Sequence, residues 1–297
     1  MTFRRGASLS TVATFGYADT ADLGPTEGNG FLQQWPDDLA LLADLGITDI
    51  RVTLDWARLQ PKPGDLDADW VERFESILEA ADAVGLRTWA TLWDGSVPRW
   101  FDNEGGLDDA DAFVTWWPRW VEKSADRFGD LVHGWVPFDL LPADSSQPWR
   151  DTWGILRGTQ PVVASIEGID GLAHIGADVG KMDRLGLVLA PEWDPSEALS
   201  DALLEQAADR WGTLVRVAAD KGDGAPVVVT GFRPGHDDLD ECARIVEVLV
   251  ATLDLAIDDG VNVEVAFIEP AIAGHDSGHG LLDSARAVTG VANIYLG

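Results

Sequence analysis

Carboxylate and tryptophan side chains recur directly after short apolar segments of this 297-residue sequence. With one arginine, the set comprises Asp19, Asp55, Trp56, Trp93, Asp94, Asp139, Glu192, Trp193, Arg233 and Glu269. Aromatic faces stack on sugar rings, and carboxylates accept hydrogen bonds from hydroxyl groups. Any single member is equally typical of a residue that caps a strand or a helix. Together, these side chains favour a site that binds carbohydrate.

The elements that position these side chains alternate between short β-branched segments and longer segments with helical spacing. Strands are predicted at 11–17, 49–56, 87–94, 131–138, 185–190, 226–232 and 261–268. Helices are predicted at 35–45, 69–84, 109–128, 162–181, 197–219 and 239–257. This alternation predicts an α/β fold of the (β/α)8 or TIM barrel type, with one strand irregular or missing. A strand at 291–296 would close the barrel, and the side chains named above would share its carboxyl end.

Composition limits the class of protein. No linker divides the chain, so one domain is expected over residues 1–297. The 51 acidic and 21 basic residues give a formal net charge of −30, which disfavours nucleic acid and anionic membranes as partners. The only cysteine, Cys242, excludes a disulfide within the chain, and no segment has the roughly 18 apolar residues of a membrane span. A cytoplasmic protein is expected, and its oligomeric state is left open.

Several segments, taken in order, resemble one known family. Residues 51–61, Arg-Val-Thr-Leu-Asp-Trp-Ala-Arg-Leu-Gln-Pro, are similar to its Arg-Phe-Ser-Ile-Ser-Trp-Ser-Arg-Ile-x-Pro motif. Residues 91–98, Thr-Leu-Trp-Asp-Gly-Ser-Val-Pro, are similar to Thr-Leu-Tyr-His-Trp-Asp-Leu-Pro, and residues 135–138 resemble the start of Trp-x-x-Phe-Asn-Glu-Pro. Phe15-Gly16 and Glu27-Gly28 are similar to the opening segment. The family is glycoside hydrolase family one, the β-glucosidases, and the resemblance implies a TIM barrel that acts on glycosides.

Both catalytic glutamates of that family are replaced where the motifs place them. The acid/base glutamate corresponds to Leu140, directly after Asp139, and the nucleophile corresponds to Gly231. The family's sugar-binding histidine corresponds to Asp94. A retaining glycosidase needs two carboxyl groups about 5–5.5 Å apart. The resemblance therefore implies that this chain has lost the family's own mechanism.

Glu269 suggests a different arrangement of carboxylates. Counting the predicted strands makes 261–268 the seventh and 291–296 the eighth. In this clan of glycosidases the nucleophile follows the seventh strand, which is the position of Glu269. The motif alignment instead makes 261–268 the eighth strand and leaves the sixth without a segment. The strand count is favoured for architecture because a closed barrel exposes no edge, and the motif alignment for descent. With either numbering of the strands, Glu269 is expected to point into the mouth of the barrel.

Three functions stay open, and whether the chain is an enzyme is undecided. The favoured one is a degenerate barrel that binds a small sugar or glycoside without hydrolysing it. The second is an active hydrolase with Glu269 as nucleophile or base and Asp139 or Glu192 as proton donor. The third is a non-catalytic scaffold or interaction protein. Candidate binding residues are Arg51, Trp56, Trp93, Asp94, Trp135, Trp193 and Asp276.

No cofactor and no metal are expected. Neither a P-loop nor a dinucleotide-binding glycine motif follows a predicted strand. His275 and His279 have the i, i+4 spacing of a metal pair but lie in a glycine-rich loop, and zinc would need Glu269 or Asp94 as a third ligand. A polar loop is therefore favoured over a metal site.

Overall fold

The computed structural model describes residues 2–18, 25–141, 146–168, 171, 181–274 and 279–297. Its parallel strands are β1 (Arg4–Leu9), β2 (Asp49–Thr53), β3 (Arg87–Trp93), β4 (Gly134–Phe138), β5 (Val163–Glu167), β6 (Arg184–Leu189), β7 (Val227–Phe232) and β8 (Val263–Ile268). They follow the order β4-β3-β2-β1-β8-β7-β6-β5 in one sheet. A single isolated bridge, Trp135 to Val162, joins the two ends of that sheet in the described residues. The predicted TIM barrel is confirmed as a nearly closed barrel with one unsealed seam.

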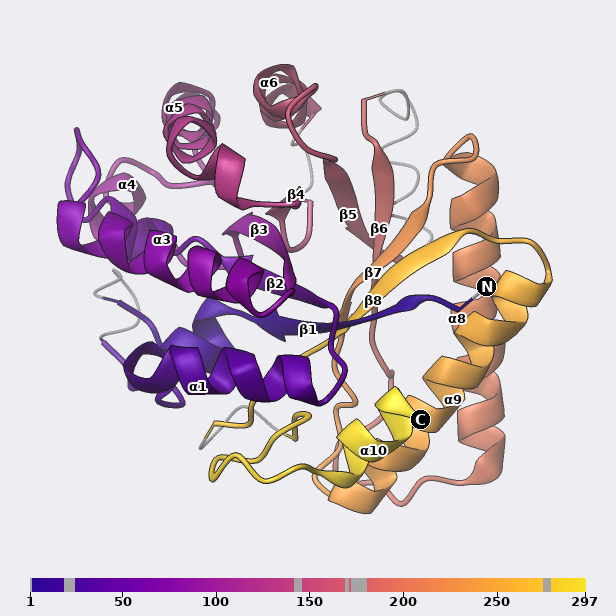
Figure 1. Ribbon diagram of the computed structural model, residues 1–297. Helices are drawn as coiled ribbons and strands as arrows, with labels where there is room; N and C mark the ends of the chain where they lie inside the picture. The colour runs from indigo at the N-terminus through magenta and orange to yellow at the C-terminus, as the bar shows by residue number, and fades with distance from the viewer. Residues whose placement is uncertain (1, 19–24, 142–145, 169–170, 172–180, 275–278) are drawn as a thin grey trace.

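Helices surround the strands (Figure 1). They are α1 (Phe31–Asp44), α2 (Trp56–Leu59), α3 (Ala68–Ala83), α4 (Arg99–Asp102), α5 (Ala110–Phe128), α6 (Ser146–Leu156), α8 (Asp201–Lys221), α9 (Leu239–Asp258) and α10 (Gly290–Leu296), with short turns η1 (Thr11–Phe15) and η2 (Gly129–Leu131). Short polar side chains begin several of them; Asp67, Asp109 and Ser200 each accept a hydrogen bond from a backbone N–H of the first turn. Within the described ranges, no helix has the length and apolar character needed to cross a membrane.

Three predicted elements are wrong. The first strand is β1 rather than 11–17. Two arginines begin it, which is atypical of a barrel strand, but Arg4 is paired with Asp49. The segment 163–167 is strand β5, although 162–181 was predicted to be helical. The segment 291–296 lies in helix α10, where Val291, Ala292 and Tyr295 are buried at helical spacing. Residues 263–268 therefore form the eighth strand, as the motif alignment predicts, and the strand count is wrong; the strand without a predicted segment is the fifth rather than the sixth.

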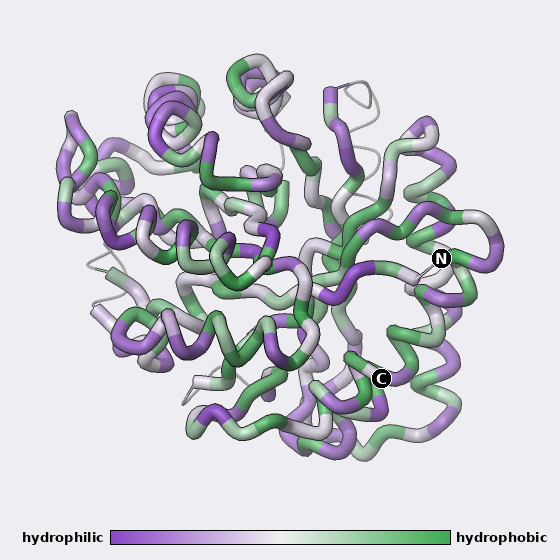
Figure 2. The backbone as a smooth tube through the Cα atoms, viewed as in Figure 1, coloured by the Kyte–Doolittle hydropathy of each residue, from purple (hydrophilic) through white to green (hydrophobic). Residues whose placement is uncertain are grey.

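The barrel interior is a thin apolar layer between two polar ends. That layer consists of Trp89, Val136, Val163, Val228, Val265 and Phe267. A much larger cluster packs between the strands and the helices, and hydrophobic residues recur along the helices around the sheet (Figure 2). Glycines make room for the interior rings, since a Cβ on Gly134 would lie 2.4 Å from the Trp89 ring. Ligand-sized space is therefore expected at the ends of the barrel rather than at its centre.

Candidate functional site

A buried arginine organises the mouth of the barrel. Arg51, in β2, has a side chain that is 2% exposed and pairs with two carboxylates. Its Nη1 donates to Asp139, and its Nη2 donates to Glu269 Oε2 over 2.8 Å. Ser8 Oγ accepts from Nε and Nη2 at 3.2 and 3.0 Å. Although burial opposes the charge of Arg51, the two carboxylates raise its pKa, so the cation is permanent.

Glu269 is held by two arginines at once. It follows β8, its side chain is 2% exposed, and its Oε1 accepts from Nη2 of Arg233 at 2.7 Å. Arg233 follows β7 and has a side chain that is 61% exposed. We call Arg51, Asp139, Arg233 and Glu269 the mouth cluster. A Cβ on Gly231 would lie 3.7 Å from Glu269 Oε2 and 3.8 Å from Arg51 Nη2, so a carboxylate from β8 occupies the space in front of β7.

Asp139 is fixed at the end of β4. Its backbone N–H donates to the Trp93 carbonyl at 2.9 Å, and its carbonyl accepts from Ser165 Oγ at 2.6 Å. Burial disfavours the ionised form, but the charge and hydrogen bond of Arg51 outweigh this and hold the pKa of Asp139 below its usual range. Asp139 is therefore ionised near neutral pH and poorly suited to donate a proton. The next residue, Leu140, has no ionisable group.

Asp94 follows β3 and carries the mouth's unsatisfied oxygen. Its Oδ2 accepts from the Thr11 backbone N–H at 2.6 Å and from Thr53 Oγ1 at 2.8 Å. Its Oδ1 is buried and has no hydrogen-bond partner among the described residues. Burial, helped by the negative charges of Asp139 and Asp55, raises the pKa of Asp94 to about 6. This carboxyl group can therefore accept or donate a hydrogen bond near neutral pH.

The other predicted site residues are more scattered. Trp93 and Trp193 are half-buried, and the indole N–H of each is buried without a partner in the described part of the chain. Trp56 and Trp135 are fully buried in the core between strands and helices. The Glu192 side chain is 74% exposed and pairs with Arg210. The predicted residues Arg51, Asp94, Asp139 and Glu269 thus come together, whereas Glu192 does not join them in any described contact, and Asp276 lies outside the described residues.

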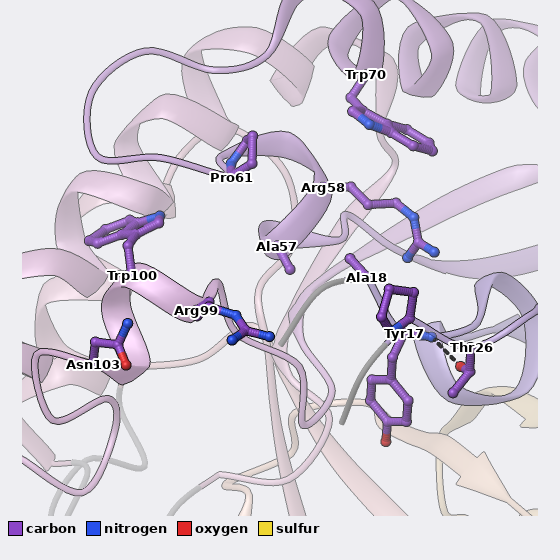
Figure 3. A pocket seen from close by; sticks show the side chains of 11 residues that line it. Tyr17, Ala18, Thr26, Ala57, Arg58, Pro61, Trp70, Arg99, Trp100 and Asn103 are labelled. Atoms are coloured by element: carbon purple, nitrogen blue, oxygen red, sulfur yellow. Dashed lines mark hydrogen bonds between the residues drawn. The ribbon is translucent and has the colours of Figure 1, made fainter. Parts of the chain in front are cut away.

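A pocket of about 530 Å³, lined by residues of the loop after η1 and of α2, α3 and α4, was not predicted from the sequence (Figure 3). We call it the aromatic pocket, after Tyr17, Trp70 and Trp100 in its wall. Arg58 contributes to the wall, forms an ion pair with Asp55, and donates to the carbonyls of residues 15 and 16 at 3.1 and 2.8 Å. Arg58 belongs to the 51–61 motif, and that motif is the sequence feature that could have indicated the pocket.

Two glycines shape the loop that carries Tyr17. Gly16 has a φ of +69°, and a Cβ there would lie 2.3 Å from the Thr26 carbonyl oxygen. A Cβ on Gly28 would lie 2.3 Å from the Thr14 carbonyl oxygen. The two chain segments can therefore approach backbone to backbone, with Thr26 N–H donating to the Tyr17 carbonyl at 3.1 Å. This contact fixes Tyr17 at the edge of the pocket.

A metal site receives no support from the described residues, where no group of three or more His, Cys, Asp or Glu side chains is arranged to hold an ion. His279 Nε2 lies 2.9 Å from the Asp237 carbonyl oxygen. His275, the other member of the predicted pair, lies outside the described residues.

Comparison with known proteins finds a family model that matches within the first half of the chain. The model of glycosyl hydrolase family 1 matches residues 20–146. The chloroplastic beta-glucosidase-like SFR2 of Oryza sativa subsp. japonica is 30% identical over 117 residues, which are 36% of this chain and 18% of that protein. Beta-glucosidase 47 of Arabidopsis thaliana is 24% identical over 202 residues, 60% of this chain and 37% of that protein. The matched part is thus well under half the length of either relative.

Solved structures match over nearly the whole fold. The family 1 β-glucosidase from Thermotoga maritima has a TM-score of 0.77 at 12% identity and covers 100% of this chain and 96% of its own. The β-glycosidase BGL167 has a TM-score of 0.76 at 16% identity and covers 99% and 95%. A further structure of the Thermotoga maritima enzyme, with a TM-score of 0.76 at 12% identity over 99% and 96% of the two chains, is a complex with deoxynojirimycin. At these identities the likeness shows the fold alone. This chain is therefore similar to glycosyl hydrolase family 1 over residues 20–146, and its barrel has the fold of the β-glucosidases of known structure.

Proposed function

We propose that this chain is one domain that binds a sugar or glycoside at the barrel mouth without hydrolysing it by a retaining mechanism. The observation that carries the proposal is the state of Glu269. Both of its oxygens accept hydrogen bonds from arginines, and its side chain is 2% exposed. A nucleophilic carboxylate must present an oxygen to the sugar, whereas here the side chain is buried and both oxygens are held by arginines.

The rest of the mouth supports recognition rather than cleavage. Asp139 is ionised by its contact with Arg51, and Leu140 and Gly231 provide no carboxyl group at the ends of β4 and β7. The exposed side of Arg233 is suited to a hydroxyl, and Oδ1 of Asp94 and the indole N–H of Trp93 are buried polar groups without a partner among the described residues. Buried polar groups without a partner are costly, so a ligand hydroxyl that satisfied them would be bound favourably.

A second function, hydrolysis by relocated carboxylates, is favoured by one observation. Asp94 has a pKa raised to about 6 and a free oxygen, as a general acid requires. Glu269 would then have to release one arginine to act as the nucleophile or base. This version predicts catalysis that depends on both Asp94 and Glu269.

Hydrolysis and binding assays together separate the two functions. We would measure hydrolysis of nitrophenyl β-glucoside, β-galactoside, β-mannoside and β-xyloside, and thermal stabilisation by the matching methyl glycosides. The proposal expects no turnover above buffer and a rise in Tm with at least one glycoside, reduced in Asp94→Ala. Turnover that is lost in Glu269→Gln but kept in Glu192→Gln, its exposed control, would establish the hydrolase. The absence of any Tm shift would contradict the binding proposal.

A further inference from the structure

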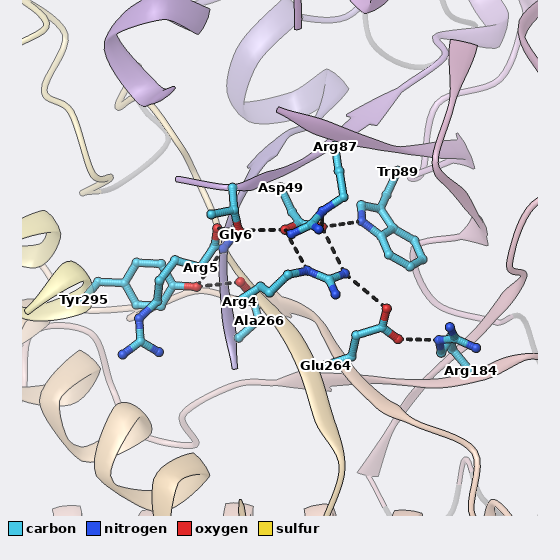
Figure 4. Close-up of polar contacts among 11 residues, drawn as sticks. Arg4, Arg5, Gly6, Asp49, Arg87, Trp89, Arg184, Glu264, Ala266 and Tyr295 are labelled. Atoms are coloured by element: carbon cyan, nitrogen blue, oxygen red, sulfur yellow. Dashed lines mark hydrogen bonds and ion pairs between the residues drawn. The ribbon is translucent and has the colours of Figure 1, made fainter. Parts of the chain in front are cut away.

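We propose that the amino end of the barrel, opposite to the mouth, binds a phosphoryl oxyanion through Arg4, Arg87 and Arg184. Arg4 begins β1, Arg87 begins β3 and Arg184 begins β6, so these side chains lie at the same end of a parallel sheet. With Asp49 of β2 and Glu264 of β8, they form what we call the amino-end network (Figure 4). This site is separate from the mouth and does not depend on the function proposed there.

The two carboxylates hold the three arginines in one cluster. Arg4 is shared between them, since its Nε donates to Asp49 Oδ2 at 3.0 Å and its Nη2 to Glu264 Oε1 at 3.1 Å. Arg87 Nη2 donates to Asp49 Oδ2 at 3.0 Å, and Arg184 Nε donates to Glu264. Neighbouring guanidinium groups are therefore linked through a single carboxylate. Their positions are fixed in advance, which lowers the entropy cost of binding a ligand.

Each arginine keeps one terminal amino group unused. Arg4 Nη1, Arg87 Nη1 and Arg184 Nη2 make no hydrogen bond within the part of the chain that the structure describes, whereas the other side-chain nitrogens of these residues all donate. None of the three is a buried atom, so solvent reaches them. The arginine side chains are 28%, 36% and 24% exposed, against 0% for Asp49 and 17% for Glu264. The network therefore presents donors rather than acceptors to solvent.

Charge favours an anion at this end of the barrel. Three guanidinium groups meet two carboxylates, which leaves one positive charge in excess within a chain of formal net charge −30. The sequence neighbours Arg5 and Asp183 carry opposite charges and leave this excess unchanged. A phosphoryl group accepts several hydrogen bonds at once, and the planar fork of arginine matches its oxygens. A halide ion has no such set of directed acceptors.

Thermal unfolding in millimolar sodium phosphate, compared with sodium chloride at equal ionic strength, tests the site. At such concentrations the general stabilisation by excluded salts is small, so a specific site dominates the difference. We expect phosphate to raise the Tm saturably by about 2–4 °C at tenfold excess over its Kd, and chloride to leave it unchanged. Methyl phosphate distinguishes two sources of the ligand. An equal shift supports a site for the phosphoryl group of a larger molecule, and a smaller shift supports a site for the free ion.

Variants of the network locate the shift. Arg87→Gln and Arg184→Gln each remove one unused amino group and leave Arg4 paired with both carboxylates, so each should lose most of the phosphate effect. Each variant is compared with itself in chloride, so a lower starting Tm does not affect the result. Arg244→Gln is the matched control, because Arg244 of α9 also pairs with two carboxylates and its side chain is 40% exposed. Equal Tm values in phosphate and chloride would overturn the site, as would a shift that both network variants keep or that Arg244→Gln loses.

Discussion

The two ends of the barrel both contain buried carboxylates and arginines, but they satisfy them differently. At the amino end, Asp49 accepts hydrogen bonds from Arg4 Nε at 3.0 Å, Arg87 Nη2 at 3.0 Å and Trp89 Nε1 at 2.9 Å (Figure 4). At the mouth, Asp94 accepts two hydrogen bonds on one oxygen, and its other oxygen has no partner among the described residues. Asp49 therefore has partners on both of its oxygens, and Asp94 has partners on only one among the described residues.

The difference is visible in the protonation of the two carboxyl groups. Burial pushes both pKa values up, but the donors around Asp49 outweigh it and hold that pKa below its usual range. The donors around Asp94 do not outweigh the effect of burial, so the pKa of Asp94 rises to about 6. Glu264 extends the network around Asp49 by pairing with Arg4 and Arg184. The same residue types thus satisfy a buried carboxylate at one end of the barrel and leave an oxygen of Asp94 without a partner, among the described residues, at the other.

Removing the charge at the amino end should have the largest effect on stability. Asp49→Asn leaves Arg4 and Arg87 without their shared carboxylate, and we expect a loss of about 2–4 kcal/mol in the free energy of unfolding. A carboxyl group whose pKa is lowered on folding stabilises the fold above its unfolded pKa of 3.8 and loses that effect only below it. Urea unfolding should show the same loss at pH 8 and pH 5. A loss that vanishes at pH 5 would mean that Asp49 is not ionised as described.

Adding a methyl group should distinguish the packed interior from the open mouth. A Cβ on Gly186, in β6, would lie 2.7 Å from both Thr230 Cγ2 and Val163 Cγ1, whereas a Cβ on Gly231 meets nothing closer than 3.7 Å. Gly186→Ala should therefore destabilise the protein by about 1–3 kcal/mol, and Gly231→Ala should stay within about 0.5 kcal/mol. Denaturant unfolding of the pair measures both changes. Similar losses in the two variants would show that the mouth is packed as tightly as the interior.

Much of the barrel could be predicted from the sequence because local periodicity marks most strands and helices. The failures have physical causes. Strand β1 was missed because Arg4 and Arg5 are atypical of a barrel strand. Arg4 is accommodated there because it pairs with Asp49 and Glu264, which the sequence does not indicate. Residues 291–296 are apolar enough for a strand, but Thr289 caps them as a helix by accepting from the Ala292 N–H. The motif alignment succeeded there because it does not depend on the apolar pattern.

The site was predictable in its residues but not in its pairing. Arg51 and Glu269 are separated by 218 positions, and nothing local indicates that they meet. The aromatic pocket was missed because a half-buried tryptophan such as Trp70 has the same helical spacing as buried core residues. Conversely, Trp56 was a candidate for sugar binding but stacks on Trp120 in the core, 5.4 Å between ring centres. Sequence position places a side chain near a strand end, but packing decides which way it faces.

Asp94 provides the subtlest test of the comparison between the two ends. A pKa of about 6 in the folded state, against 3.8 unfolded, means that ionised Asp94 destabilises the fold at pH 8. Asp94→Asn keeps an oxygen to accept from Thr11 and Thr53 and removes the charge, so it should stabilise the protein by about 1–2 kcal/mol at pH 8, with allowance for solvent screening. Because the folded group binds its proton below about pH 6, the gain should fall to about half at pH 5. Urea unfolding at the two pH values measures this slope. Stabilisation that does not change with pH would attribute the effect to packing, and destabilisation would mean that Asp94, like Asp49, is part of a completed network.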